Sequence, residues 1–158
     1  AASYALQALP ADAALGYFTK CFNQADSRLI DDPSAKFYVT RSVADNLRDS
    51  LRTKTLTNGL VETTENGRPQ LKFEGYPIMV RSDWDRDIKA LFDNGTTVDL
   101  PHRILFTTPD NIPVATLSTD DLSTLDSFYD RTLKSNIVDV AFSLDTKFLE
   151  SYMAVAAY

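Results

Sequence analysis

Three stretches of the chain repeat hydrophobic residues at steps of three and four, which is the spacing of one face of an α-helix. The first follows Asp12 and the second follows Ser42, and either residue can cap a helix. The third begins at Asp83 and stops at Asn94–Gly95. We therefore expect two to three amphipathic helices, each burying one face. Their apolar faces are Ala14, Leu15, Phe18, Cys21, Phe22 and Ala25; Val43, Leu47 and Leu51; and Trp84, Ile88, Leu91 and Phe92.

Short apolar and β-branched runs between and after these helices predict a series of strands. The Asn66–Gly67 pair predicts a hairpin whose apolar side needs a partner, and Pro109–Asn111 predicts a turn that makes a second hairpin. Ile78–Val80 is wholly apolar, so we expect it to be buried. Together the pattern predicts an α+β fold with a central mixed or antiparallel sheet flanked by two to three helices. The predicted strands cover residues 36–40, 60–64, 70–74, 78–80, 103–107, 113–117, 137–145 and 152–158.

Composition narrows the class of protein more than it identifies a function. The chain has 158 residues and 44% apolar residues, which fits one soluble domain or one domain with part of another. Its net charge of −6 and its scattered basic residues argue against a nucleic-acid partner, since phosphate contacts need clustered Lys and Arg. No apolar run is long enough to cross a bilayer, so we expect no membrane partner. The chain begins without Met and without a signal-peptide pattern, which suggests processing or excision from a longer protein.

Cys21 and His102 are the single cysteine and the single histidine of the chain. One cysteine cannot form an intrachain disulfide, and its place on an apolar helix face predicts a buried, unreactive thiol. A Cys21–His102 or Ser–His102–Asp catalytic site is possible by composition, but no nucleophile-elbow motif surrounds a serine. His102 follows Pro101 at the entrance to a strand, where we expect a hydrogen-bonded structural histidine.

The run Asp83-Trp84-Asp85-Arg86-Asp87 is the strongest candidate for chemistry in the sequence. Its alternating carboxylates resemble the start of a calcium loop, but that pattern needs Gly at the sixth position and Glu at the twelfth. This chain has Ile88 and Asn94 there, so the calcium interpretation fails. A glycan- or small-molecule-active site that uses the three carboxylates, with Trp84 as a sugar platform, stays open as an alternative. A helix cap at Asp83 and a core position for Trp84 explain the same residues without chemistry.

The sequence contains no other motif that is typical of a catalytic or ligand-binding site. Glycines are too few and too scattered for a phosphate-binding loop, and a structural zinc site lacks ligands. We therefore expect no enzyme and assign no catalytic, cofactor-binding or metal-binding residues.

The order of the motifs nevertheless resembles a known family. A helix (ALGYFTKCFNQAD) is followed by a strand and helix (KFYVTRSVADNLRDSL), a polar hairpin, LKFEGYPIMVRSDWD, LPHRILFTTPDNIPVAT and a closing VAFSLDTKFLESYMAVAAY. Over nearly all of residues 13–158 this arrangement resembles the C-terminal half of major capsid proteins of tailed bacteriophages, which have the HK97-like fold.

The resemblance implies a structural subunit of a phage or prophage shell, located in the virion after assembly in the bacterial cytoplasm. It implies that residues 36–145 form the core of an axial domain, which meets copies of itself in pentamers and hexamers. Residues 1–35 would be a lead-in segment and helix of peripheral type, and residues 146–158 a returning strand. A scaffold or other virion proteins are possible further partners. An encapsulin-like compartment shell, which shares the fold, stays open as an alternative.

Overall fold

The computed structural model describes residues 5–53, 61–63, 69–116, 125–140 and 143–158. By its internal contacts the chain divides into two units, each described here by itself. Unit 1 comprises Ala1–Asn111 and Glu150–Tyr158, and unit 2 comprises Ile112–Leu149. These contact units differ from the boundaries at 35/36 and 145/146 that the family resemblance implies. Those boundaries concern roles within a shell subunit and stay a prediction.

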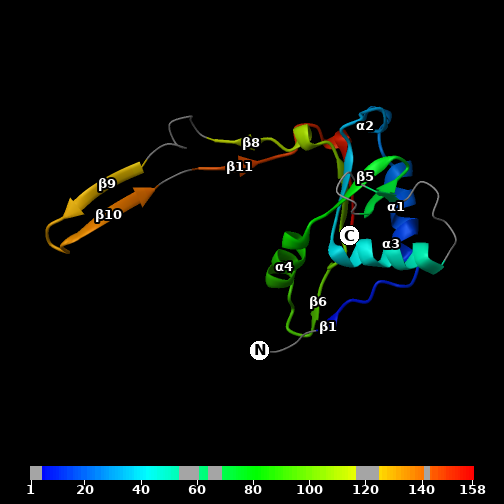
Figure 1. Cartoon of the computed structure of the whole chain (residues 1–158), viewed down its shortest axis with the longest axis horizontal. Helices are drawn as coiled ribbons and strands as arrows, with labels where there is room; N and C mark the ends of the chain where they lie inside the picture. The colour runs from blue at the N-terminus through cyan, green and yellow to red at the C-terminus, as the bar shows by residue number, and fades with distance from the viewer. Residues whose placement is uncertain (1–4, 54–60, 64–68, 117–124, 141–142) are drawn as a thin grey trace. The chain divides into compact units, whose positions relative to one another are not determined.

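Unit 1 is built on a six-stranded sheet with the order β12-β7-β2-β5-β4-β3. Figure 1 labels β5 of this sheet. The central pair β2–β5 is parallel and the other neighbours are antiparallel, so the sheet is mixed. The predicted α+β class with a mixed central sheet is therefore confirmed. Its strands are β2 (Lys36–Val39), β3 (Val61–Thr63), β4 (Pro69–Phe73), β5 (Tyr76–Val80), β7 (Ile104–Thr107) and β12 (Ala154–Ala157).

Four α-helices and a small accessory ladder complete the described part of unit 1. The strands β1 (Ala5–Leu6) and β6 (Thr97–Val98) pair in parallel and hold the beginning of the described chain beside residues 97–98. Short 3₁₀ turns precede the last strand and follow β7. The helices are α1 (Ala13–Asn23), α2 (Ser27–Ile30), α3 (Arg41–Thr53) and α4 (Ser82–Leu91), and the 3₁₀ turns are η1 (Pro109–Asn111) and η3 (Ser151–Met153).

The core lies where α1 and α3 pack against one face of the sheet. Alternate residues of each strand point to that face, as the pleat requires. At its centre Phe37 stacks on Phe106 with 4.2 Å between ring centroids, and Phe18 and Phe73 meet Phe37 edge-on. The two helices contribute the residues that their three- and four-residue spacing predicts. The buried residues of this core are Ala14, Phe18, Cys21, Leu29, Ala35, Phe37, Val39, Val43, Ala44, Leu47, Leu51, Leu71, Phe73, Ile78, Ile104 and Phe106.

The beginnings of the helices differ from the caps that the sequence predicts. Asp12 precedes α1 but adopts a left-handed backbone and makes no capping hydrogen bond with its side chain. Instead the Asn46 Oδ1 atom, on α3, accepts a hydrogen bond of 3.1 Å from the Ala14 backbone N–H. Ser42 and Asp83 are also not caps, since α3 begins at Arg41 and α4 at Ser82. Asn46, from another helix, thus caps α1, whereas the sequence predicts that Asp12 does so.

The predicted hairpin of residues 60–74 is confirmed as an antiparallel pairing of β3 with β4. Its Asn66–Gly67 turn lies outside the described residues. The partner that the hairpin needs is β5, which pairs with β4 on the other side. Leu71 and Phe73 are consequently buried in the core rather than left on a projecting arm.

The second predicted hairpin, of residues 103–107 with 113–117, is wrong. The strand β7 pairs with β2 and β12, whereas β8 (Val114–Ala115) pairs with β11 (Asp145–Thr146) in unit 2. The chain therefore leaves unit 1 after Asn111 and returns to it at Glu150.

Three predicted burials are also wrong. In β5 only Ile78 is buried, because Met79 and Val80 are 41% and 37% exposed. On α4 only Ile88 is buried, while Leu91 is 77% exposed. Trp84 lies half-buried outside the core rather than within it. For Trp84 and Leu91 the reason is that α4 contributes no residue to the core between the sheet, α1 and α3.

Unit 2 contains two antiparallel ladders, each of two strands: β8 with β11, and β9 (Leu125–Asp130) with β10 (Ser135–Val140). Among the side chains that the structure describes between residues 112 and 149, none is buried. The alternating run of residues 137–145 was predicted as one strand. It forms two, β10 and β11, on either side of residues outside the described part. The described side chains of this unit therefore form no core.

Candidate functional site

His102 joins three segments of unit 1 through its two ring nitrogens. Its Nδ1 atom lies 2.7 Å from the Ser42 hydroxyl at the beginning of α3. Its Nε2 atom lies 2.8 Å from the backbone carbonyl of Gln7, which precedes α1. A carbonyl only accepts, so in the neutral ring Nε2 carries the proton and Nδ1 accepts from Ser42. The predicted structural, hydrogen-bonded histidine is thus what the geometry shows.

The Ser42–His102 hydrogen bond is one contact that a nucleophilic site needs. The described residues around it do not supply the other groups of such a site. A serine nucleophile needs a base that is oriented by a third group and an anion-stabilising site beside it. Asp85 lines a cavity together with Ser42 and His102, but its carboxylate accepts from the Arg41 backbone N–H at 3.1 Å. The ring is oriented by Gln7 instead. The Ser42 hydroxyl also lies 3.3 Å from that of Thr40, which in turn accepts from the Arg103 backbone N–H. The network fastens the end of β2 and the beginning of β7 to the beginning of α3.

His102 lines two cavities in unit 1. The larger, of about 220 Å³, is mostly apolar and is bordered by Leu9, Val43 and Ile104 among others. The smaller, of about 170 Å³, lies between α3, α4 and Pro101. The polar residues that line the smaller cavity are Ser42, Asp85, Lys89 and His102.

We expect the substitution His102→Ala to lower the free energy of unfolding of unit 1 by about 1–3 kcal/mol, because the Ser42 hydroxyl and the Gln7 carbonyl both lose the hydrogen bond to the ring. Urea titration followed by Trp84 fluorescence measures the change. The matched control is Arg86→Ala, since the Arg86 side chain is 80% exposed on α4 and should change stability by less than about 0.5 kcal/mol. Equal stabilities for the two variants would contradict a structural role for His102.

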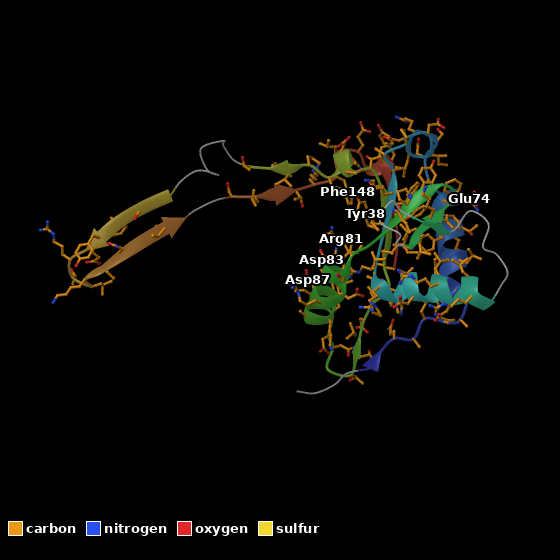
Figure 2. All side chains as sticks on the ribbon, in the orientation of Figure 1. Tyr38, Glu74, Arg81, Asp83, Asp87 and Phe148 are labelled. Carbon is orange, nitrogen blue, oxygen red and sulfur yellow. The ribbon has the colours of Figure 1, made fainter. Side chains whose placement is uncertain are left out.

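The acidic side chains of α4 each have a separate partner. Figure 2 labels Arg81, Asp83 and Asp87 along this segment. The Asp83 carboxylate accepts a hydrogen bond of 2.8 Å from Arg81, which holds its pKa below the usual range. Asp87 pairs with Arg86 at 3.1 Å, and Asp85 accepts from the Arg41 backbone. The three carboxylates therefore do not converge on one ligand, and Trp84 lines neither of the two cavities.

Cys21 is confirmed as a buried thiol at the core face of α1, with 2% of its surface exposed. Burial raises the pKa of this thiol, so little thiolate forms near neutral pH. Cys21 and His102 do not meet, since both ring nitrogens of His102 have other partners. Within the described ranges, no group of three or more His, Cys, Asp and Glu side chains is arranged to hold a metal. The same ranges contain no helix that is long and apolar enough to span a membrane.

The feature that sequence reasoning missed is the exposed apolar surface of unit 2. Its signal was the alternating pattern of residues 137–145, which predicts a strand but does not say what covers the apolar face of that strand. In the structure the large apolar side chains of this unit lie in solvent. They are Val114, Phe128, Tyr129, Leu133, Val138, Leu144, Phe148 and Leu149.

Comparison with known proteins gives a likeness of fold. No protein-family model matches the sequence, and no curated protein matches it. A solved structure from Mycobacterium phage Che8 superposes with a TM-score of 0.58 at 13% sequence identity. The match covers 97% of this chain and 52% of the phage chain, so the chain spans about half the length of that protein. At this identity the likeness shows a shared fold, and the chain has the fold of one half of a bacteriophage protein.

Proposed function

We propose that this chain is a structural subunit of a bacteriophage or prophage capsid shell, which assembles with copies of itself around the capsomer centres. The observation that carries the proposal is the fold likeness to a protein of Mycobacterium phage Che8 across 97% of the chain. The order of sequence motifs, which resembles the C-terminal half of HK97-like capsid proteins, supports the same role independently. Its location would be the virion, and its partners copies of itself.

The distribution of surfaces is compatible with this role. A shell subunit needs surfaces that meet copies of itself under closed symmetry, rather than a pocket that holds a substrate. Unit 2 exposes large apolar side chains such as Phe128 and Leu133, and it has no buried residue among those described. Large exposed apolar patches mark interaction sites in soluble proteins. On the described residues nothing favours the carboxylate-based glycan-active alternative, because Asp83, Asp85 and Asp87 have separate partners.

Electron microscopy of the protein expressed from its complete reading frame tests the proposal. We expect closed, symmetric shells or capsomers in purified preparations, with this sequence present in the particle band of a gradient. A protein that stays monomeric across salt, pH and crowding conditions that assemble other shells would contradict the proposal. A capsomer map with the six-stranded unit at its centre would support axial contacts, and one with that unit at the rim would contradict them.

A further inference from the structure

One wall of the larger cavity of unit 1 is the segment that runs from β1 to α1 (Figure 1). Two hydrogen bonds fasten this segment. The His102 ring donates to the Gln7 carbonyl at 2.8 Å, and the Asn46 Nδ2 atom donates to the Pro10 carbonyl at 3.0 Å. Between them Leu9 packs against the core. The wall is therefore held at both ends, and the cavity of about 220 Å³ is a preformed feature of unit 1.

The opposite wall of this cavity is apolar and comes from three further elements. Val43 of α3 is 2% exposed, and Ile104 of β7 is 3% exposed. Ala157 of β12 pairs directly with Ile104, so the two side chains point to the same side of the sheet. These three side chains offer no hydrogen bond to an occupant, and they gain when apolar surface is removed from water.

Several polar atoms around the cavity already have partners. Both ring nitrogens of His102 are hydrogen-bonded to other groups. The Pro10 carbonyl accepts from Asn46, and the Leu100 carbonyl lies 3.5 Å from the Arg103 Nε atom. A ligand that took one of these groups for itself would break an existing hydrogen bond. The site therefore favours an occupant that needs no hydrogen bonds.

The exposed residues that line the cavity are large and apolar or aromatic. Tyr17 and Leu100 are each 41% exposed, and Tyr158 is 80% exposed. Leu100 also has a backbone φ of 48°, which a bulky residue adopts only at an energetic cost. Backbone strain of this kind clusters at sites that clamp ligands. The strained residue thus lies at the cavity that the other observations single out.

We propose that this cavity binds a small, uncharged aromatic molecule of one or two rings, held between Leu9 on one side and Val43 and Ile104 on the other. An engineered apolar cavity of about 150 Å³ binds benzene. The cavity of about 220 Å³ therefore has room for a somewhat larger ring system such as indole. A charged or strongly polar ring would lose its hydration without gaining partners.

Titration of the whole chain with benzene and with indole, followed by methyl resonances, tests the site. We expect saturable shifts at Leu9, Val43 and Ile104, and none at Leu29 or Leu47, which are buried but line neither cavity. Pyrazine, a polar ring of nearly the size of benzene, should bind about tenfold more weakly. The proposal is overturned by a lack of saturable shifts with both apolar probes, by equal binding of pyrazine, or by shifts spread over the whole core.

Filling the cavity tests its location. Ala157→Leu adds apolar volume where the ligand would lie and should weaken benzene binding about tenfold. The matched control is Ala156→Leu, the same change at the exposed neighbour on the other face of β12, which should leave binding unchanged. Circular dichroism checks that both variants fold. Unchanged benzene affinity in a folded Ala157→Leu variant would overturn the proposal.

Enlarging the cavity gives a second test that does not depend on the folding of Ala157→Leu. Leu9→Ala removes side-chain volume from the opposite wall, so the preference for indole over benzene should rise roughly threefold. An unchanged ratio of the two affinities would contradict a ligand position beside Leu9.

The ligand site and the capsid role are independent, because the cavity lies within unit 1 of one copy. Shells seen by electron microscopy without benzene or indole binding would overturn the ligand site alone. Binding of these probes with no shell or capsomer under any condition would uphold the ligand site and contradict the capsid role.

Discussion

The substitution Phe37→Ala is expected to lower the free energy of unfolding of unit 1 by about 3–5 kcal/mol, which is the usual cost of emptying a buried aromatic site. Phe37 has no exposed surface and stacks on Phe106 with an interplanar angle of 14°. Phe18 and Phe73 contact the same ring with centroids at 5.2 and 5.9 Å. Helix α1 and the strands β2, β4 and β7 meet at this one side chain, so their shared packing is lost together.

Urea denaturation followed by circular dichroism and Trp84 fluorescence measures this loss. The matched control is Phe128→Ala, which removes the same atoms from an exposed position of unit 2 and should change the stability of unit 1 by less than about 0.5 kcal/mol. An intermediate variant, Phe37→Leu, keeps part of the volume and should lose less than the alanine variant. A Phe37→Ala variant as stable as the control would show that the aromatic cluster does not organise unit 1.

The sequence predicts the elements of this core well, because local periodicity and burial agree there. The spacing of Phe18 and Cys21 on α1, and of Val43 and Leu47 on α3, reports a helix with one face against the sheet. The strands β2 and β7 alternate in the same way. Where each residue's local preference and its tertiary environment point to the same state, the pattern is informative.

The predictions fail where a residue's environment depends on a distant segment. The apolar run Ile78–Val80 predicts that β5 is a strand. It carries no information about which of its faces is covered, so the exposure of Met79 is not predicted. Asp12 has the right chemistry for a cap, yet Asn46 from another helix takes that role at α1. The segment after Asn111 was assigned to a local hairpin, whereas its partner strand begins at Asp145. Short-range turn signals carry no information about such pairings.

The candidate site likewise has features that the sequence predicts and features that it does not. Sequence reasoning predicted a structural His102, but its partners Ser42 and Gln7 lie 60 and 95 residues away along the chain, beyond the reach of any spacing rule. The carboxylates near Trp84 look like a cluster in the sequence because alternate residues carry charge. On a helix Asp83 and Asp87 share one face and Asp85 points to another. Each carboxylate finds its own partner.

The other large effect is expected at Asn111, the last residue of unit 1 before the chain enters unit 2. Its amide Nδ2 lies 3.0 Å from the Glu150 carbonyl, 3.2 Å from the Met153 carbonyl and 3.2 Å from the Thr107 hydroxyl. Its Oδ1 atom accepts from the Glu150 backbone N–H at 2.8 Å. One buried side chain thus fastens the point where the chain leaves unit 1 to the point where it returns.

The substitution Asn111→Ala should lower the free energy of unfolding of unit 1 by about 2–3 kcal/mol, because it leaves the Glu150 N–H and carbonyl without the Asn111 partner in a partly buried setting. Hydrogen exchange should show faster opening of β12, since the strand loses its anchor at η3 while its ladder with β7 stays intact. The control is Asp110→Ala, an exposed neighbour in the same 3₁₀ turn, which should leave both measurements nearly unchanged. Protection of β12 equal in the two variants would mean that the ladder with β7, and not Asn111, holds the returning strand in place.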